Sequence, residues 1–336
     1  MNGVATAADA GRAARATAML VVVTLLWGLS FAWMKNWQEA ARGAPGGPLL
    51  SGLTLIALRM PLAILVLAAW QPRLFTAATR REYAAGALIA VPFTGGFVLQ
   101  VWGLNWTTPA LSAFVTSLCS AWAPLLAWAC LGVAVGRLNL LGLAVALAGT
   151  AVLGLRLDEG WALGPGEALT LLASLLFALE LLLLDRLGRA VNSAHLTAGF
   201  LGTAAVLAGL AATAVAARGP GLAGWAAWVS DMLGRPPVLR DLALMTLLPT
   251  VLAFHWMNVY QPRVPVGRAA LIYLLEPVFS SAFSVWWKHD QVTETLLLGG
   301  GLVLAGNLLV ELPRWLGGAG TPGSKPTPGS KTRPGL

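Results

Sequence analysis

The chain has 336 residues, of which 57% are hydrophobic and only 11% are charged, against roughly 25% charged in an ordinary soluble domain. This composition excludes a soluble globular protein and indicates a membrane protein. The net charge of +8 does not indicate nucleic-acid binding, because the lysines and arginines fall in connections and tails rather than on one helix face.

Ten apolar segments of about 18 to 24 residues follow one another along the chain, each long enough to cross a hydrocarbon core of about 30 Å as a helix. Backbone polar groups need partners within the chain inside a bilayer, so helices are favoured over strands. We therefore predict an all-α integral membrane protein with ten transmembrane helices. The expected spans are 16–35, 49–70, 84–103, 108–131, 138–155, 166–185, 194–217, 242–260, 266–287 and 293–313.

The basic residues predict the orientation of these spans. Of the 22 lysines and arginines, fourteen fall on one side if the spans alternate, seven on the other, and Arg59 inside a span. By the positive-inside rule both termini are cytoplasmic. The first span follows Arg12 and Arg15 and could be a signal peptide, but it is longer than a usual h-region. We expect a multi-pass protein of the inner (plasma) membrane.

An internal repeat divides the chain into two halves. "LGLAVALAG" (141–149) and "LGGGLVLAG" (298–306) share five of nine positions, and "LLWGLSFAWMK" (25–35) aligns with "LLFALELLLLD" (175–185) without a gap. Five spans per half place the second half in the membrane upside down, which is the inverted-topology repeat of secondary transporters. We predict a first five-helix repeat over 1–156 and a second over 157–313.

Two further segments are set apart by composition. The long connection between residues 217 and 242 carries Trp225, Trp228 and Met232 at helical spacing, so it is either a short interfacial helix on the outer face or an ordinary surface loop. Residues 314–336, with "TPGSK" twice, predict a disordered cytoplasmic tail.

Motifs for catalysis or metal binding are not apparent. Cys119 and Cys130 lie about 16 Å apart along one helix and cannot form a disulfide, and no HExxH, GxSxG or phosphate-binding glycine loop occurs. We expect no enzyme activity, no cofactor and no metal.

The residues of several spans resemble a known family. "LLWGLSFAWMK", "ALRMPLA" (57–63), "LSAFVTSLCSAWAPLLAW" (111–128) and "RAALIYLLEPVFSSAFSVWW" (268–287) are similar to the EamA-type branch of the drug/metabolite transporter superfamily. The resemblance covers 16–313 and implies a ten-helix transporter, often an exporter of amino acids or other small metabolites, without a cofactor. The connections "GVAVGRLN" (132–139) and "WWKHDQVTE" (286–294) depart from the family pattern, so no role is transferred to them.

Ionisable residues inside the spans are candidates for transport, because such residues are costly in lipid. Glu276, Glu180 and Arg59 lie near the middle of their spans, and His255 lies toward the inner part of its span. Glu276 and Glu180 could bind a substrate amine or a proton, or pair with Arg59, which could instead hold a substrate carboxylate. His255 is a proton-relay candidate or a hydrogen-bonded core residue.

Prolines and aromatic residues complete the predicted site. Pro124 and Pro277 align between the halves and predict a bend, or hinge, in both spans. Side chains that could line a substrate pocket are Trp27, Trp33, Trp102, Trp122, Tyr273 and Asn258.

These features predict a secondary transporter that moves a small metabolite by alternating access, with coupling to protons as a further hypothesis. With both glutamates ionised the buried charges sum to minus one, so a carboxylate should take up a proton or hold a cationic ligand. An amino acid or amine-bearing solute is therefore favoured, with export as the direction. The alternatives are a sugar-phosphate or nucleotide-sugar exchanger, or a channel-like pore. We expect a small-molecule substrate, the lipid bilayer and no nucleic acid as partners, and a monomer or weak dimer.

Overall fold

The computed structural model describes residues 7–132, 134–153, 155–156, 160–161, 164–188, 191–192, 195–264 and 266–316. The predicted tail beyond Leu316 and the repeat boundary at residue 157 lie outside these ranges. The elements are α1 (Ala7–Ala40), α2 (Gly47–Trp70), α3 (Arg73–Thr76), α4 (Arg80–Gly103), α5 (Pro109–Ser117), α6 (Cys119–Leu131), α7 (Arg137–Leu153), β1 (Leu155–Arg156), β2 (Gly160–Trp161), α8 (Pro165–Gly188), α9 (Leu196–Arg218), α10 (Gly221–Leu233), α11 (Pro236–Met245), η1 (Thr246–Leu252), α12 (Ala253–Tyr260), η2 (Gln261–Arg263), α13 (Val266–Tyr273), α14 (Glu276–Trp286) and α15 (Glu294–Leu316).

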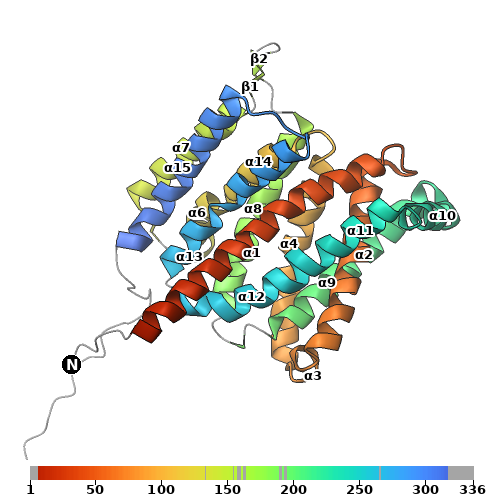
Figure 1. The fold of residues 1–336 in the computed structure, drawn as a ribbon, viewed down its shortest axis with the longest axis horizontal. Coiled ribbons are helices and arrows are strands. Elements are labelled where there is room, and N and C mark those ends of the chain that lie inside the picture. The colour runs from red at the N-terminus through yellow and green to blue at the C-terminus, as the bar shows by residue number, and fades with distance from the viewer. Residues whose placement is uncertain are drawn as a thin grey trace, which may run out of the picture.

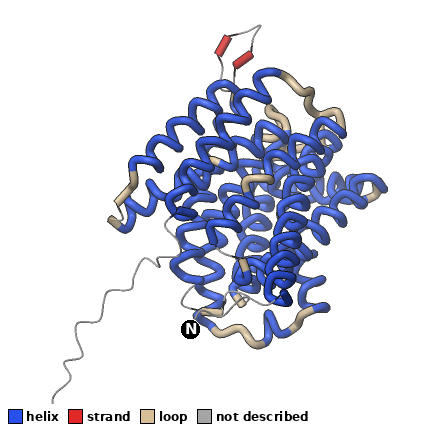
Figure 2. The backbone as a smooth tube through the Cα atoms, turned by 60° about the vertical axis from the view of Figure 1, so that its left-hand side comes forward, coloured by secondary structure: helices blue, strands red, loops and turns tan. Residues whose placement is uncertain are grey.

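Helices make up almost all of the described chain, and the strands form one short antiparallel hairpin that projects from the bundle (Figure 2). This arrangement confirms the all-α membrane fold. Eight described helical stretches are long and apolar enough to cross a membrane: Ala14–Ala40, Gly47–Trp70, Arg80–Gly103, Pro109–Leu131, Pro165–Gly188, Leu196–Arg218, Pro236–Met257 and Glu294–Leu312. The expected fifth and ninth spans are also helical but shorter, over Arg137–Leu153 and Leu271–Trp286.

Two of the spans are interrupted. The ninth breaks between α13 and α14, directly before Pro277, whose ring and missing N–H oppose a continuous helix. The fourth breaks at Leu118, between α5 and α6, whereas α6 runs on through Pro124. The expected bend at Pro124 is thus found six residues earlier. Both breaks are tightened by bonds to the third preceding residue, from the Leu275 amide to Ile272 and from the Leu118 amide to Val115.

Glycines bring several pairs of helices into backbone contact. α7 and α15 cross antiparallel, with Gly142 against Gly306 and Gly149 against Gly299, and they lie side by side along one edge of the molecule (Figure 1). α4 meets α9 at Gly86, and α1 meets α14 at Gly28. Small residues allow this close approach, which a membrane protein needs because lipid supplies no hydrophobic drive between helices.

The largest buried apolar cluster lies between α1, α2, α4, α9 and α11 and includes Met34, Ile56, Ile89, Leu201 and Leu242. α10 lies beside this cluster as a short helix, which decides between the two interpretations of its connection. Trp225 Nε1 donates to Thr54 Oγ1 at 2.9 Å, and Trp228 packs edge-on against Trp37. We call the end of the bundle that carries α10 and the β hairpin the α10 end, and the opposite end the α3 end.

Candidate functional site

Glu276 and Glu180 approach a common region beside the two interrupted spans. Glu276 is the first residue of α14, and Glu180 lies in the second half of α8. Both side chains are half-buried, and neither forms an ion pair or hydrogen bond with another described residue. Both interact electrostatically with Cys119, the first residue of α6, and Glu276 also with Tyr273. Two carboxylates without a partner among the described residues therefore act on the start of α6.

Backbone packing holds Glu276 in place. A Cβ atom at Gly28 of α1 would lie 2.9 Å from the Glu276 carbonyl oxygen and 2.9 Å from the Ser280 amide nitrogen. Ser280 is fully buried, and its hydroxyl donates to the Pro109 carbonyl oxygen at 3.1 Å. The first turn of α14, where a carboxylate is favoured by the helix dipole, is thus fixed between α1 and the start of α5.

Arg59 does not pair with either glutamate. Its side chain is 5% exposed, and its Nε donates to Thr250 Oγ1 at 2.7 Å. The guanidinium lies over the ring of Phe97, 5.3 Å from the centroid, while its Nη1 has no hydrogen-bond partner among the described residues. Thr250 is available because it sits in the π-helical turn η1, where its hydroxyl also donates to the Met245 carbonyl oxygen at 3.2 Å.

The predicted aromatic residues divide into two places. The ring of Trp27 packs against Tyr273 and Phe254, with centroid distances of 5.5 and 6.0 Å, and its Nε1 donates to the Pro249 carbonyl oxygen at 3.1 Å. Trp102 lies instead at the α10 end, against the exposed Trp106. Trp27 and Tyr273 thus remain near Glu276, whereas Trp102 belongs to the end of the bundle.

His255 lies away from the carboxylates, at the end of α2. Its Nδ1 is 2.7 Å from Gln71 Nε2, and its ring packs against Trp70 at a centroid distance of 4.7 Å. These contacts are those expected of a hydrogen-bonded core residue. The side chain of Asn258 lies outside the described part of the structure.

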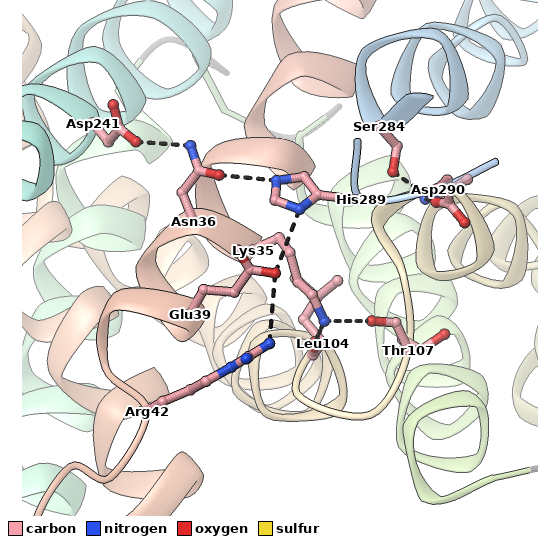
Figure 3. A network of polar contacts seen from close by, with 11 residues as sticks. Lys35, Asn36, Glu39, Arg42, Leu104, Thr107, Asp241, Ser284, His289 and Asp290 are labelled. Atoms are coloured by element: carbon pink, nitrogen blue, oxygen red, sulfur yellow. Dashed lines mark hydrogen bonds and ion pairs between the residues drawn. The ribbon is translucent and has the colours of Figure 1, made fainter. Parts of the chain in front are cut away.

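A second polar cluster, which the sequence did not single out, lies at the α10 end (Figure 3). Lys35 Nζ donates to the carbonyl oxygens of Leu104 and Thr107 at 2.6 and 2.8 Å. Asn36 and Glu39 of α1 meet His289 from the connection between α14 and α15. The spacing of Lys35 and Glu39, one helical turn apart at the end of a span, is the signal that could have indicated it.

A cleft of about 230 Å³ opens beside this cluster, between α1 and α11, and is lined by Asn36, Glu39, Pro237 and Arg240 among others. Within the described ranges, no three histidine, cysteine or acidic side chains come together as a metal site.

Comparison with known proteins identifies the second half of the chain. Residues 164–312 match the EamA-like transporter family. No curated protein matches the chain. Among solved structures, fifteen chains match; one, described only as a crystal structure of a protein, is 19% identical, covers 90% of this chain and 99% of its own, and superposes with a TM-score of 0.54. That similarity shows a shared fold over most of the chain. The second half of the chain is therefore similar to the EamA-like transporter family.

Proposed function

We propose that the protein is a carrier for a small solute with an amine, and that Glu276 and Glu180 bind the amine near the membrane midplane. The observation that carries this proposal is that two carboxylates share one region of the bundle without a basic partner among the described residues. A carboxylate inside a bilayer is costly unless it is paired or protonated. A solute ammonium or a proton offsets that cost, which is also why proton coupling is proposed.

Alternating access is supported by the way the two halves pack. The alignment of residues 25–35 with 175–185 makes α8 correspond to α1, and the alignment of Pro124 with Pro277 makes α6 correspond to α14. α1 packs on α14 and α8 packs on α6, while the glycines of the corresponding helices α7 and α15 face each other antiparallel. A two-fold axis in the membrane plane relates such contacts, so we propose ten spans in two inverted repeats with the α10 end outside. Export is the proposed direction.

Transport by purified full-length protein in liposomes tests the proposal. Uptake and counterflow are measured for amino acids, amines, sugar phosphates and nucleotide sugars, each with and without a pH gradient. We expect saturable counterflow of amine-bearing solutes, and its loss in Glu276→Gln and Glu180→Gln. Glu294→Gln is the matched control, because Glu294 is an exposed carboxylate at the start of α15. Unchanged amine transport in both site variants would contradict the proposal.

An anionic solute is the second candidate, because Arg59 is buried in a span and its Nη1 has no partner among the described residues. A guanidinium binds carboxylate or phosphate well. Counterflow of sugar phosphates alone, abolished by Arg59→Gln and insensitive to Glu276→Gln, would favour this candidate, whereas flux without counterflow or saturation would indicate a pore.

A further inference from the structure

His289 joins several segments of the chain at the α10 end. It lies in the connection between α14 and α15, with its side chain 7% exposed. Its Nε2 is 2.9 Å from Asn36 Oδ1, and its Nδ1 is 3.5 Å from Glu39 Oε1 (Figure 3). We infer that His289, Asn36 and Glu39 form a proton-sensitive latch that keeps the outer side of the carrier closed. The inference rests on the proposed function, since only a carrier needs its outer side to open and close.

The hydrogen bonds of Asn36 decide which form of the imidazole fits. Asn36 Nδ2 donates to Asp241 Oδ2 at 2.9 Å, so its Oδ1 faces His289 as an acceptor and His289 Nε2 must carry a proton. In a neutral imidazole Nδ1 would then be an acceptor, and it would face the carboxylate of Glu39, which also only accepts. Protonation turns this contact into a charge-assisted hydrogen bond. The latch is therefore complete only with the imidazolium.

Several charged groups surround the latch, and most have partners of their own. Arg42 lies 3.8 Å from Glu39 and Arg240 lies 2.8 Å from Asp241. Glu39 is the one carboxylate of the described residues within ion-pair distance of the His289 ring. The titratable and charged groups come from α1 (Lys35, Glu39, Arg42), from α11 (Arg240, Asp241) and from the connection itself (Lys288, Asp290).

The bonds around the latch cross the boundary between the two halves. Asp290, next to the latch histidine, accepts from the amide of Ala110 in the first turn of α5 at 3.2 Å. Asn36 of the first half also donates through Nδ2 to Asp241 Oδ2 of the second half at 2.9 Å, whereas the bonds of Lys35 to Leu104 and Thr107 stay within the first half. Separating the halves at this end requires the bonds of Asp290 and Asp241 and the latch to break together. The contact between His289 and Glu39 differs from the other bonds between the halves, because its strength depends on protonation of the imidazole.

The latch predicts that acid on the outer side disfavours outward opening. Protonation supplies the charged donor that faces Glu39, and loss of that proton removes the donor, so acid strengthens the contact and base weakens it. Loss of one charge-assisted bond should raise the population of the open form about fivefold to tenfold.

Cys119 serves as a reporter that needs no solute. It interacts electrostatically with Glu180 and Glu276, whereas Cys130 is exposed and is replaced by serine. A membrane-impermeant maleimide is added to right-side-out vesicles that contain the full chain, and the rate of Cys119 labelling is measured at pH 6 and pH 8. Comparing variants at one pH removes the ionisation of the thiol itself.

We expect His289→Gln to be labelled about fivefold to tenfold faster than the parent at pH 6 and at nearly the same rate at pH 8. Glu39→Gln should behave likewise, because protonated His289 then lacks its carboxylate. His195→Gln is the control, since His195 pairs with Glu82 at the α3 end, and it should match the parent. The latch would be overturned if the ratio of the Cys119 labelling rates of His289→Gln and the parent were the same at pH 6 and pH 8. It would also be overturned if no variant were labelled from outside. Because no solute is added, this result is separate from the counterflow test.

Discussion

The contact between α1 and α14 at Gly28 gives a quantitative test of how the site is held. In Gly28→Ala the new Cβ would lie 2.8 Å from Phe279 Cβ and 2.9 Å from both the Glu276 carbonyl oxygen and the Ser280 amide. None of these atoms is the end of a flexible side chain. Reaching an ordinary contact of 3.4 Å requires α14 to move by about 0.6 Å, and such overpacking typically costs about 1 to 3 kcal/mol.

Gly301→Ala is the matched control, because a Cβ at Gly301 has nothing within 4 Å. Both substitutions replace a helical glycine by alanine, so their intrinsic effect on helix formation is shared. Unfolding in mixed micelles, followed by the fluorescence of the fifteen tryptophans, should show Gly28→Ala less stable than Gly301→Ala by about 1 to 3 kcal/mol. Transport should fall with it, since Glu276 moves with α14. Equal stability of the two variants would refute the close contact.

Three other changes probe single contacts. Thr250→Val removes the described partner of Arg59 Nε and should lower the free energy of unfolding by about 1.5 to 3 kcal/mol in the same micelle assay, whereas Thr250→Ser should stay near wild type. Gln71→Ala tests whether His255 acts only as a hydrogen-bonded core residue: counterflow and its pH profile should then stay unchanged, whereas a shifted pH profile would favour a proton relay at His255. Trp27→Phe keeps the ring but loses the hydrogen bond to the π-helical turn, and should cost about 1 kcal/mol in the same unfolding assay.

Periodicity and the length of the apolar segments predicted the helices well, because backbone polar groups inside a bilayer must form hydrogen bonds within the chain. The glycine repeats 141–149 and 298–306 also indicated their role, since Gly142, Gly149, Gly299 and Gly306 all lie in the α7 and α15 crossing. Pro277 likewise marked the interruption of its span. The helices, the glycine contacts and this interruption can be predicted because each depends on a residue type at a given position or spacing within one segment.

Contacts between distant segments could not be predicted in the same way. Asn36 and His289 lie 253 residues apart, and neither local sequence contains a pattern that predicts their contact. Charge alone allows Arg59 to pair with a glutamate or to hold a substrate carboxylate. Its Nε instead donates to Thr250 Oγ1, because the π-helical turn brings that hydroxyl to it. No proline lies at the break at Leu118. A search for helix-breaking residues therefore places the bend at Pro124, six residues later.

The backbone crossing of α7 and α15 bears on how the chain is assembled. α7 is synthesised early, but α15, which covers its glycines, is synthesised after every other described helix. Until α15 enters the membrane, the face of α7 that carries Gly142 and Gly149 has no permanent neighbour, and the first half remains an unfinished unit. The first half expressed alone should therefore be degraded quickly, whereas the two halves produced as separate chains should rescue one another.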